Sequence, residues 1–542
     1  MGIISARKLA ILPQKACTMI RYTSENQLPL SGFETPFETT LDNSNRWVRL
    51  AHLIPWDELA SAYYSSFHHS HGRPAKDARL VIGAVIIKHK LCLSDEETIE
   101  QIRENLYYQY FVGLKMFQTK AIFAPSLFVE IRKRMGEQVF KAFEQSIINA
   151  VSDKQSEKSD DDSDDSGAGH PEGENETIDE ISHKGKVILD ATVVEQAIRF
   201  PTDLGLLNEA REISEKIIDE LHPHTPFSIK PRTYREKARK DYLAIVKRRR
   251  PGKKLYRKGN KQQLQYLRRN FKHIEKMLDS LTGKAIPLSY KRLRQYWIIQ
   301  ILVTQQAMMH ETKTQRCDDR IVSISQPHVR PIIRGKQNKA VEFGAKLSVS
   351  LTGDKIACVD ELRWDAFHEA QDLKPQVEAY KVRHGHYPEK VLADPLYGTR
   401  SNRHYLKEKG IHFAGKPLGR PKKETEENKA QLKREKQQRH KDYTQRIPIE
   451  GKFGQGKNAY GLNKIKAKTA STSYAWINSI FFVMNLLVLA RLFHLPGIIQ
   501  RLFKLPWTLT FKNLSTQSQK GVKWFNRVYC PPACYSIDCC KV

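Results

Sequence analysis

The sequence predicts an α/β fold in which a mixed sheet is flanked by helices and preceded by a helical domain. Lys186–Val194 is a short apolar run with a carboxylate in its middle, which is typical of a buried strand. Phe343–Leu362 alternates apolar and polar residues around a turn at 352–354, which predicts a hairpin. Helical and strand patterns then alternate along the chain, and this order of elements is typical of a mixed sheet covered by helices.

Residues 45–150 precede the predicted sheet and show helical periodicity. Leu53–Phe67 carries apolar residues at helical spacing, and Gly72–Leu114 predicts two further helices. Ser94 and Glu97 have the spacing of a capping box at the start of the second of these helices. A compact basic helical domain fits DNA binding and dimerisation equally well.

Residues 151–183 divide the helical domain from the α/β part at 184–495. They are acidic and of low complexity, with almost no apolar side chains to bury, so we expect a disordered linker. Residues 496–542 form a C-terminal extension to which we assign no function. Four cysteines crowd its end, but they lack two well-spaced ligand pairs, so we favour a ragged extension over a zinc site. These cysteines are Cys530, Cys534, Cys539 and Cys540.

The chain is strongly basic, with 90 Lys and Arg against 60 Asp and Glu and a formal net charge of +30 in 542 residues. A surplus of this size attracts polyanions, so a nucleic acid is the first candidate partner and an anionic membrane surface the second. Trp476–Phe493 is apolar, but it is short for a bilayer span and contains Asn478, Asn485 and Arg491. We therefore interpret it as a buried helix, and without a signal peptide pattern the protein is expected to be cytoplasmic.

The region from Leu206 to about Gln305 is helical and lies after the first predicted strand. Between Lys230 and Lys272 it has 18 Lys and Arg against two acidic residues, with aromatic residues interleaved. This pattern favours a surface that follows a DNA backbone, although a solvated helical hairpin is the alternative. The densest run of this predicted DNA-binding surface is Lys247, Arg248, Arg249 and Arg250.

Three carboxylates have contexts that indicate chemistry. Asp190 lies within the first predicted strand, Asp394 follows the apolar strand KVLA, and Glu450 lies among basic residues. A carboxylate inside an apolar strand is costly to ionise unless a cation or a donor meets it. Two strand carboxylates and one from a helix can converge on divalent cations, and a pair of such cations can act on a phosphodiester. Strand-end aspartates that only cap helices are the alternative.

The residues around Glu450 carry a family resemblance. Tyr443, Arg446, Glu450 and Lys457 have the spacing Y-x2-R-x3-E-x6-K, which resembles the YREK signature of bacterial insertion-sequence transposases of the DDE class. The segment GRPAKDARLVIGAVIIKHKL resembles the helical domain that precedes the catalytic core in that family. Other blocks that look like the family's are Asp190–Arg211, Arg320–Lys336, Val341–Ser350 and Leu392–Ile411. The resemblance runs in order from about residue 45 to 495.

This resemblance implies an RNase H-like core in which Asp190, Asp394 and Glu450 bind two Mg²⁺ or Mn²⁺ ions per active site. It implies that Tyr443, Arg446 and Lys457 contact DNA near the cleaved strand. The activity it implies is cleavage of double-stranded DNA at terminal inverted repeats and strand transfer into target DNA. We expect a homodimer on DNA in the bacterial cytosol, associated with the nucleoid, with no membrane and no small-molecule substrate.

Two local expectations accompany this interpretation. Pro448 fits best in the first turn of a helix, which would place Glu450 on the helix and leave Tyr443 and Arg446 in the segment before it. Asp203 is a fourth acidic candidate, for which we favour helix capping or local structure. Two other functions remain open: a DNA-binding protein without catalysis, and an RNase H-like nuclease that cuts without strand transfer.

Overall fold

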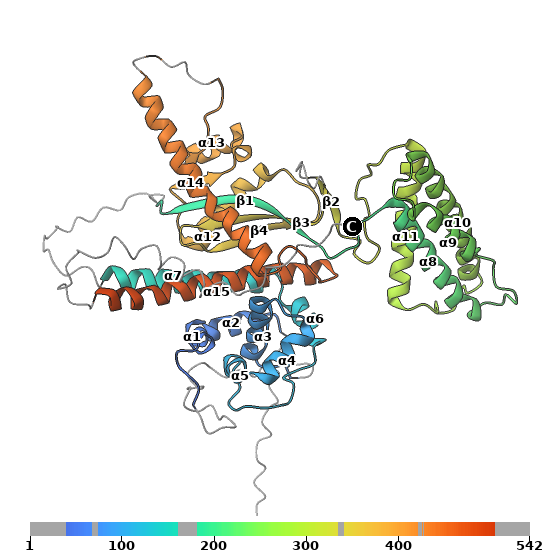
Figure 1. Cartoon of the computed structure of the whole chain (residues 1–542), viewed down its shortest axis with the longest axis horizontal. Coiled ribbons are helices and arrows are strands. Elements are labelled where there is room, and N and C mark those ends of the chain that lie inside the picture. The colour runs from blue at the N-terminus through green and yellow to red at the C-terminus, as the bar shows by residue number, and fades with distance from the viewer. Residues whose placement is uncertain are drawn as a thin grey trace, which may run out of the picture. The chain divides into compact units, whose positions relative to one another are not determined.

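The computed structural model describes residues 40–67, 74–160, 182–333, 341–420, 425 and 428–503. The chain divides into two units, 1–489 and 490–542. Of the second unit, the structure describes only the end of helix α15 (Ala470–Phe503). The first unit contains the helical domain, the sheet and the helical insertion (Figure 1). The C-terminal cysteines and most of the predicted acidic linker lie outside the described residues.

The N-terminal domain is helical, as predicted, but Gly72–Leu114 forms three helices rather than two. The Asn105 side chain accepts hydrogen bonds from the amides of Tyr107 and Tyr108, so a new helix starts where the sequence pattern looks continuous. Ser94 Oγ accepts from the amide of Glu97 at 3.0 Å, which is the predicted N-cap. The helices are α1 (Arg46–Leu53), α2 (Trp56–Tyr64), α3 (Ala78–Leu91), α4 (Asp95–Glu104), α5 (Leu106–Phe111), α6 (Leu127–Arg134) and α7 (Glu137–Asp160).

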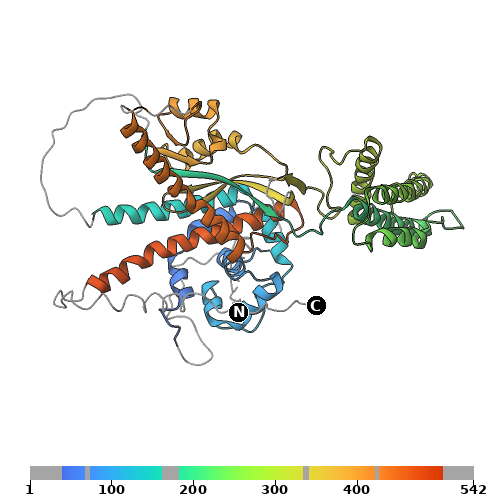
Figure 2. The ribbon, with the colours of Figure 1, turned by 45° about the horizontal axis from the view of Figure 1, so that its top comes forward.

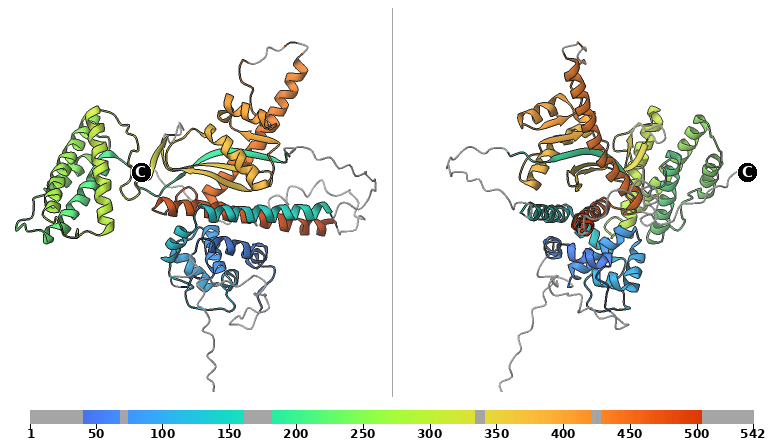
Figure 3. Two further views of the ribbon diagram at one scale, coloured as in Figure 1. Left: turned by 180° about the vertical axis from the view of Figure 1, so that it is seen from behind. Right: turned by 60° about the vertical axis from the view of Figure 1, so that its left-hand side comes forward.

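Helix α7 continues ten residues past the predicted end of the domain at 150, to Asp160. The residues after 150 include Gln, Glu and Lys, which form helices readily. The prediction considered their acidity, low complexity and lack of apolar side chains, but not their helix propensity. Figures 2 and 3 show α7 beside α15 in each view. The rings of Phe143 and Phe482 lie 4.9 Å apart between these helices, so α7 packs on the helix that ends the first unit.

The sheet is mixed, which confirms the predicted fold class. Its strand order is β2-β3-β1-β5-β6, and β4 also pairs with β3. Strand β1 is central, antiparallel to β3 and parallel to β5. The strands are β1 (Lys186–Glu195), β2 (Arg330–Ile333), β3 (Val341–Thr352), β4 (Ala357–Arg363), β5 (Lys390–Ala393) and β6 (His412–Ala414).

Helices cover the two faces of the sheet, and strand alternation assigns each side chain to a face. Val187 and Leu189 of β1 belong to a buried cluster with side chains of α12 (Leu373–His384) and α13 (Arg400–Glu408). Asp190, which is next along the strand, therefore faces the opposite side. There it meets α14 (Lys429–Ala459), the long helix that crosses β1 in Figure 1.

The helical insertion lies between β1 and β2 and has its own hydrophobic core, to which Leu207, Leu267 and Leu302 contribute. Its ends are tied together by Asp203, whose Oδ1 accepts from Arg320 at 2.6 Å and from Gln306 at 2.9 Å. Asp203 therefore has structural partners, but they are distant in sequence, whereas helix capping or local structure was predicted; Thr202 is the N-cap of the helix that begins at Asp203. The helices are α8 (Asp203–Leu221), α9 (Arg235–Val246), α10 (Lys253–Asp279) and α11 (Tyr290–Thr312), with a short 3₁₀ turn η3 (His222–His224) after α8.

Most of helix α15 between Ala470 and Leu489 is buried, as predicted. Among the described residues, the segment Ala470–Leu492 is long and apolar enough to cross a membrane, yet 72% of its most apolar stretch is buried inside the protein. The polar side chain of Asn485 has a structural partner, because it bonds the backbone amide and carbonyl of Ala357 at 3.0 and 2.8 Å. Helix α15 thus bonds to the backbone of β4 at the edge of the sheet.

A charged cluster joins α7 to the sheet. Arg383 of α12 forms an ion pair with Asp360 of β4, and Gln376 donates to the same carboxylate at 2.9 Å. Glu144 of α7 borders a cavity of about 220 Å³ that Asp360 also lines. Burial raises the pKa of Glu144 to about 7, and the negative charge of Asp360 acts in the same direction. Glu144 is therefore largely protonated in the folded protein at pH 6.

This raised pKa predicts a stability that falls as the pH rises. An unfolded glutamate has a pKa near 4.3, so between about pH 4.3 and 7 the folded state binds more protons. The free energy of unfolding therefore falls by up to about 4 kcal/mol across this window. We expect Glu144→Gln to remove most of the difference in the free energy of unfolding between pH 5 and pH 8, as measured by urea denaturation. Glu137→Gln is the matched control on the same helix, because Glu137 is exposed and pairs with Lys141. Equal pH dependence in Glu144→Gln and wild type would contradict the assignment.

Candidate active site

Asp190 is a carboxylate on the central strand. It lies opposite Val349 of β3, and its Oδ1 accepts from the amide of Ala191 at 2.8 Å. Its Oδ2 accepts from Arg446 Nη1 of α14 at 3.4 Å. Burial raises the pKa of Asp190 to about 6; the Ala191 amide and Arg446 oppose this, and the nearby charges of Glu369 and Asp394 add to it. The side chain thus lies where a cation would stabilise it.

Asp394 lies beside Asp190 at the end of the neighbouring strand. Leu189 and Ala393 are direct partners in the parallel β1–β5 ladder, so the residues that follow them are adjacent. Asp394 Oδ1 accepts from the amide of Leu396 at 3.0 Å and starts the short 3₁₀ turn η5 (Pro395–Tyr397). The strand-end position predicted for Asp394 is confirmed.

Glu450 reaches Asp190 through Arg446. Arg446 Nη2 donates to Glu450 Oε1 at 2.6 Å, while its Nη1 contacts Asp190. The Arg446 side chain is 14% exposed and that of Glu450 is 52% exposed, so the guanidinium lies below the more open carboxylate. One cation therefore links two of the three predicted ligands.

The prediction that Pro448 begins a helix was wrong. Pro448 lies inside α14, which runs without a break from Lys429 to Ala459. A proline removes one backbone hydrogen bond from a helix interior. Buried Ile449 and Phe453, which follow it, hold this part of the helix against the protein.

Tyr443, Arg446, Glu450 and Lys457 consequently share one helix. Their spacings of three, four and seven residues place them along one face. Arg446 lies over the Tyr443 ring at 5.7 Å, and Tyr443 is 58% exposed. Lys457 is half-buried, two turns beyond Glu450.

A cleft of about 670 Å³ opens beside Asp394. The wall formed by α14 includes Tyr443, Arg446, Lys436 and Arg439. Sequence reasoning missed Lys436 and Arg439, although both keep the helical spacing of Tyr443 and Arg446. This helical spacing was not recognised because the helix was expected to start at Pro448.

Sequence reasoning also missed a carboxylate, Glu369, which lies near Asp190 and pairs with Lys346 of β3 at 2.8 Å. It belongs to the 3₁₀ turn η4 (Glu369–Asp372), in a stretch without a sequence pattern. Buried Asn402 of α13 donates to the carbonyls of Ala370 and Tyr397 at 2.7 and 2.9 Å. These two bonds fix η4 against η5, the turn that begins at Asp394.

The donor set fits a divalent cation. Carboxylate oxygens are the ligands that Mg²⁺ and Mn²⁺ prefer, and Asp190 is buried beside like charges. Within the ranges that the structure describes, no three acidic, histidine or cysteine side chains are grouped closely enough to hold a metal ion. Arg446 already bonds Asp190 and Glu450, so a metal at these residues requires the guanidinium to leave them.

The predicted DNA-binding run at 247–250 is not part of this site. Lys247 caps the end of α9, and Arg248–Arg250 form the exposed connection to α10. This connection belongs to the insertion, which has its own core apart from the sheet. Its role in DNA binding stays a prediction.

Two segments of the chain match known protein families. Residues 391–487 match the family described as "Transposase DDE domain", and residues 36–134 match "Transposase domain (DUF772)". The chain is also 32% identical over 189 residues to an uncharacterized protein, ORF8 in the nfe locus of Rhizobium meliloti. That match covers 34% of this chain and 80% of the relative. The chain belongs to the DDE transposases.

The DDE domain has an RNase H-like fold, so the mixed sheet of this chain belongs to that fold. Transposases act on DNA, and DDE transposases use divalent metal ions. Asp394 and Glu450 lie within the matched DDE segment, whereas Asp190 and the helical insertion lie in the stretch 135–390 that neither family match covers. No solved structure matches the chain at a significant level.

Proposed function

We propose that this protein is the transposase of an insertion sequence, which cuts DNA at the terminal inverted repeats and joins the freed ends to target DNA. One observation carries the proposal. Asp190 and Asp394 lie side by side on neighbouring strands, and Glu450 is connected to Asp190 through Arg446. Two adjacent carboxylates in an RNase H-like sheet, with a third connected to them through an arginine, support phosphoryl transfer on DNA in a DNA-processing family.

The three carboxylates are proposed to hold two Mg²⁺ or Mn²⁺ ions. The chemistry that such a pair supplies is activation of the attacking oxygen and stabilisation of the leaving oxygen on one phosphate. In the first reaction a water oxygen bonds to phosphorus as the bond to the 3′ oxygen breaks, and that oxygen takes up a proton. In the second, the 3′-OH attacks a target phosphodiester, and one bond again replaces another without a covalent enzyme intermediate.

Several surfaces are proposed to hold the DNA. Tyr443, Arg446 and Lys457 would contact the strand near the scissile phosphate, once Arg446 exchanges its carboxylates for phosphate oxygens. The exposed run at 247–250 would neutralise phosphates elsewhere on the duplex. The N-terminal helices would read the terminal repeat, and pairing of two ends would require a homodimer on DNA in the bacterial cytosol.

Glu450→Gln tests the proposal. Wild type and variant would be compared on a labelled transposon-end duplex with Mg²⁺ or Mn²⁺ and a target plasmid. We expect cleavage and joining by the wild type, and loss of both in the variant while DNA binding survives. Cleavage without joining would favour a nuclease. Binding with no chemistry from either protein on verified ends would favour a non-catalytic DNA-binding protein.

A further inference from the structure

The N-terminal half of α14 is rich in cations, and three of them share one face of the helix. Residues 429–446 contain seven Lys and Arg against two acidic residues, Glu435 and Asp442. Asp442 is buried and neutralised by an ion pair with Lys390 of β5. At about 100° per residue, Lys436, Arg439 and Arg446 fall within roughly 80° of helix surface. The face that bears Arg446 and Glu450 therefore extends toward the N-terminus of α14 as a basic surface.

The same cations border one cleft. Lys436 and Arg439 line it together with Asp394, and Lys416 lines it from the segment after β6. Leu392 and Ala414 also line this cleft, so apolar side chains accompany the basic wall. A groove with cations along one wall and an apolar floor suits a nucleotide chain, whose phosphates are charged and whose sugars are not.

Neither Lys436 nor Arg439 has an internal role that would account for its position. Among the residues that the structure describes, neither forms an ion pair with a carboxylate. Lys436 is exposed and Arg439 is half-exposed. Their charges are therefore available to a polyanion.

The geometry points to a phosphate track: we propose that Lys436 and Arg439, together with Lys416 of the same cleft, bind the backbone of the DNA strand that flanks the scissile phosphate. At about 1.5 Å per residue, the ten residues from Lys436 to Arg446 span about 15 Å. The phosphates of one strand are spaced about 3.4 Å along the axis of duplex DNA, so a track that runs parallel to that axis passes about four phosphates. This inference rests on the proposed function, since it takes the neighbouring carboxylates as the site of cleavage.

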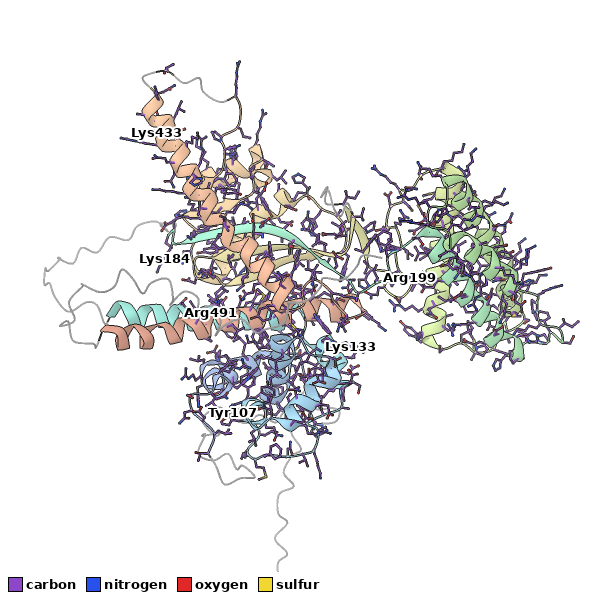
Figure 4. All side chains as sticks on the ribbon, in the orientation of Figure 1. Tyr107, Lys133, Lys184, Arg199, Lys433 and Arg491 are labelled. Atoms are coloured by element: carbon purple, nitrogen blue, oxygen red, sulfur yellow. The ribbon has the colours of Figure 1, made fainter. Side chains whose placement is uncertain are left out.

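The test is the salt dependence of DNA binding by the full chain. Lys436→Ala/Arg439→Ala removes two charges from the cleft. Lys433→Ala/Lys441→Ala removes two exposed charges of the same helix that fall outside this face of roughly 80° and do not line the cleft. Figure 4 labels Lys433 on α14. Binding of a fluorescent transposon-end duplex would be followed over a series of NaCl concentrations without divalent metal, and ethylation interference would map the contacted phosphates.

We expect the cleft variant to reduce the slope of log K against log salt by about two, because each phosphate contact contributes about 0.9. It should also lose interference at about two phosphates beside the cleavage site, one for each cation that is removed. The control pair should keep the wild-type slope and interference pattern, and Arg439→Lys should keep the slope. Equal slopes for the two double variants, or interference lost elsewhere, would overturn the track. If the track is contradicted in this way but the wild type still cleaves the ends, the proposed function stands. If the wild type binds no DNA, both the track and the proposed function are wrong.

Discussion

Asp190→Asn is expected to reduce DNA-end cleavage by on the order of 10³-fold or more, because an amide cannot supply the negative charge that a divalent cation needs. The substitution keeps the shape of the side chain and its hydrogen bond from Ala191. It also removes a buried carboxylate whose pKa is raised by burial and by neighbouring charges, so the metal-free fold should not be weakened. Cleavage of a labelled end in Mn²⁺, with thermal unfolding alongside, measures both effects.

Asp203→Asn is the matched control for this experiment. Asp203 is also half-buried and acidic, but it pairs with Arg320 at the base of the insertion rather than with the sheet residues. We expect near-normal cleavage and a stability loss of at most about 1 kcal/mol, which is typical of a partly exposed ion pair. If Asp190→Asn cleaved as well as Asp203→Asn, Asp190 would not be a catalytic ligand.

Arg446→Ala is expected to increase the affinity for Mn²⁺ in the absence of DNA by about tenfold, which corresponds to about 1.4 kcal/mol. In the wild type the guanidinium bonds both Asp190 and Glu450, so a metal ion must displace a cation to reach them. The same substitution should reduce end cleavage, because the proposed contact between Arg446 and a phosphate is lost. Metal binding and catalysis would thus change in opposite directions.

Calorimetric titration with Mn²⁺ separates these two effects without an activity assay. Arg439→Ala is the control, since Arg439 lines the same cleft but pairs with no carboxylate among the described residues. It should leave the affinity for Mn²⁺ unchanged. An unchanged affinity in Arg446→Ala would show that the guanidinium does not compete with metal at these carboxylates.

The sequence was informative where a residue's neighbours along the chain determine its structure. The apolar run around Asp190, the hairpin turn at 352–354 and the strand before Asp394 were all predictable, because strand periodicity and turn residues are local signals. These signals placed Asp190 and Asp394 on strands. Their adjacency depends on the pairing of β1 with β5, which brings together residues about 200 positions apart and has no local signal.

Where local rules conflicted with tertiary packing, packing decided the outcome. Pro448 obeys a helix-start preference, yet burial of Ile449 and Phe453 keeps it inside a helix. Arg446 was predicted to contact DNA, and the sequence held no indication that it would first bond Asp190 and Glu450. Such ion pairs depend on which helix face meets the sheet, and that orientation is set by the whole core.

The tie between the two ends of the helical insertion bears on the order of folding. Val187 and Thr352 pair directly in the β1–β3 ladder, although 165 residues separate them (352 minus 187). Once the ion pair between Asp203 and Arg320 has formed, the 117 residues between them (320 minus 203) no longer lengthen the loop. A loop of 48 residues then remains to be closed (165 minus 117). Closing the shorter loop is easier by about 1 kcal/mol. Helical segments form early because their contacts are local, so the insertion would act as an internal folding aid that brings the two longest strands within reach of each other.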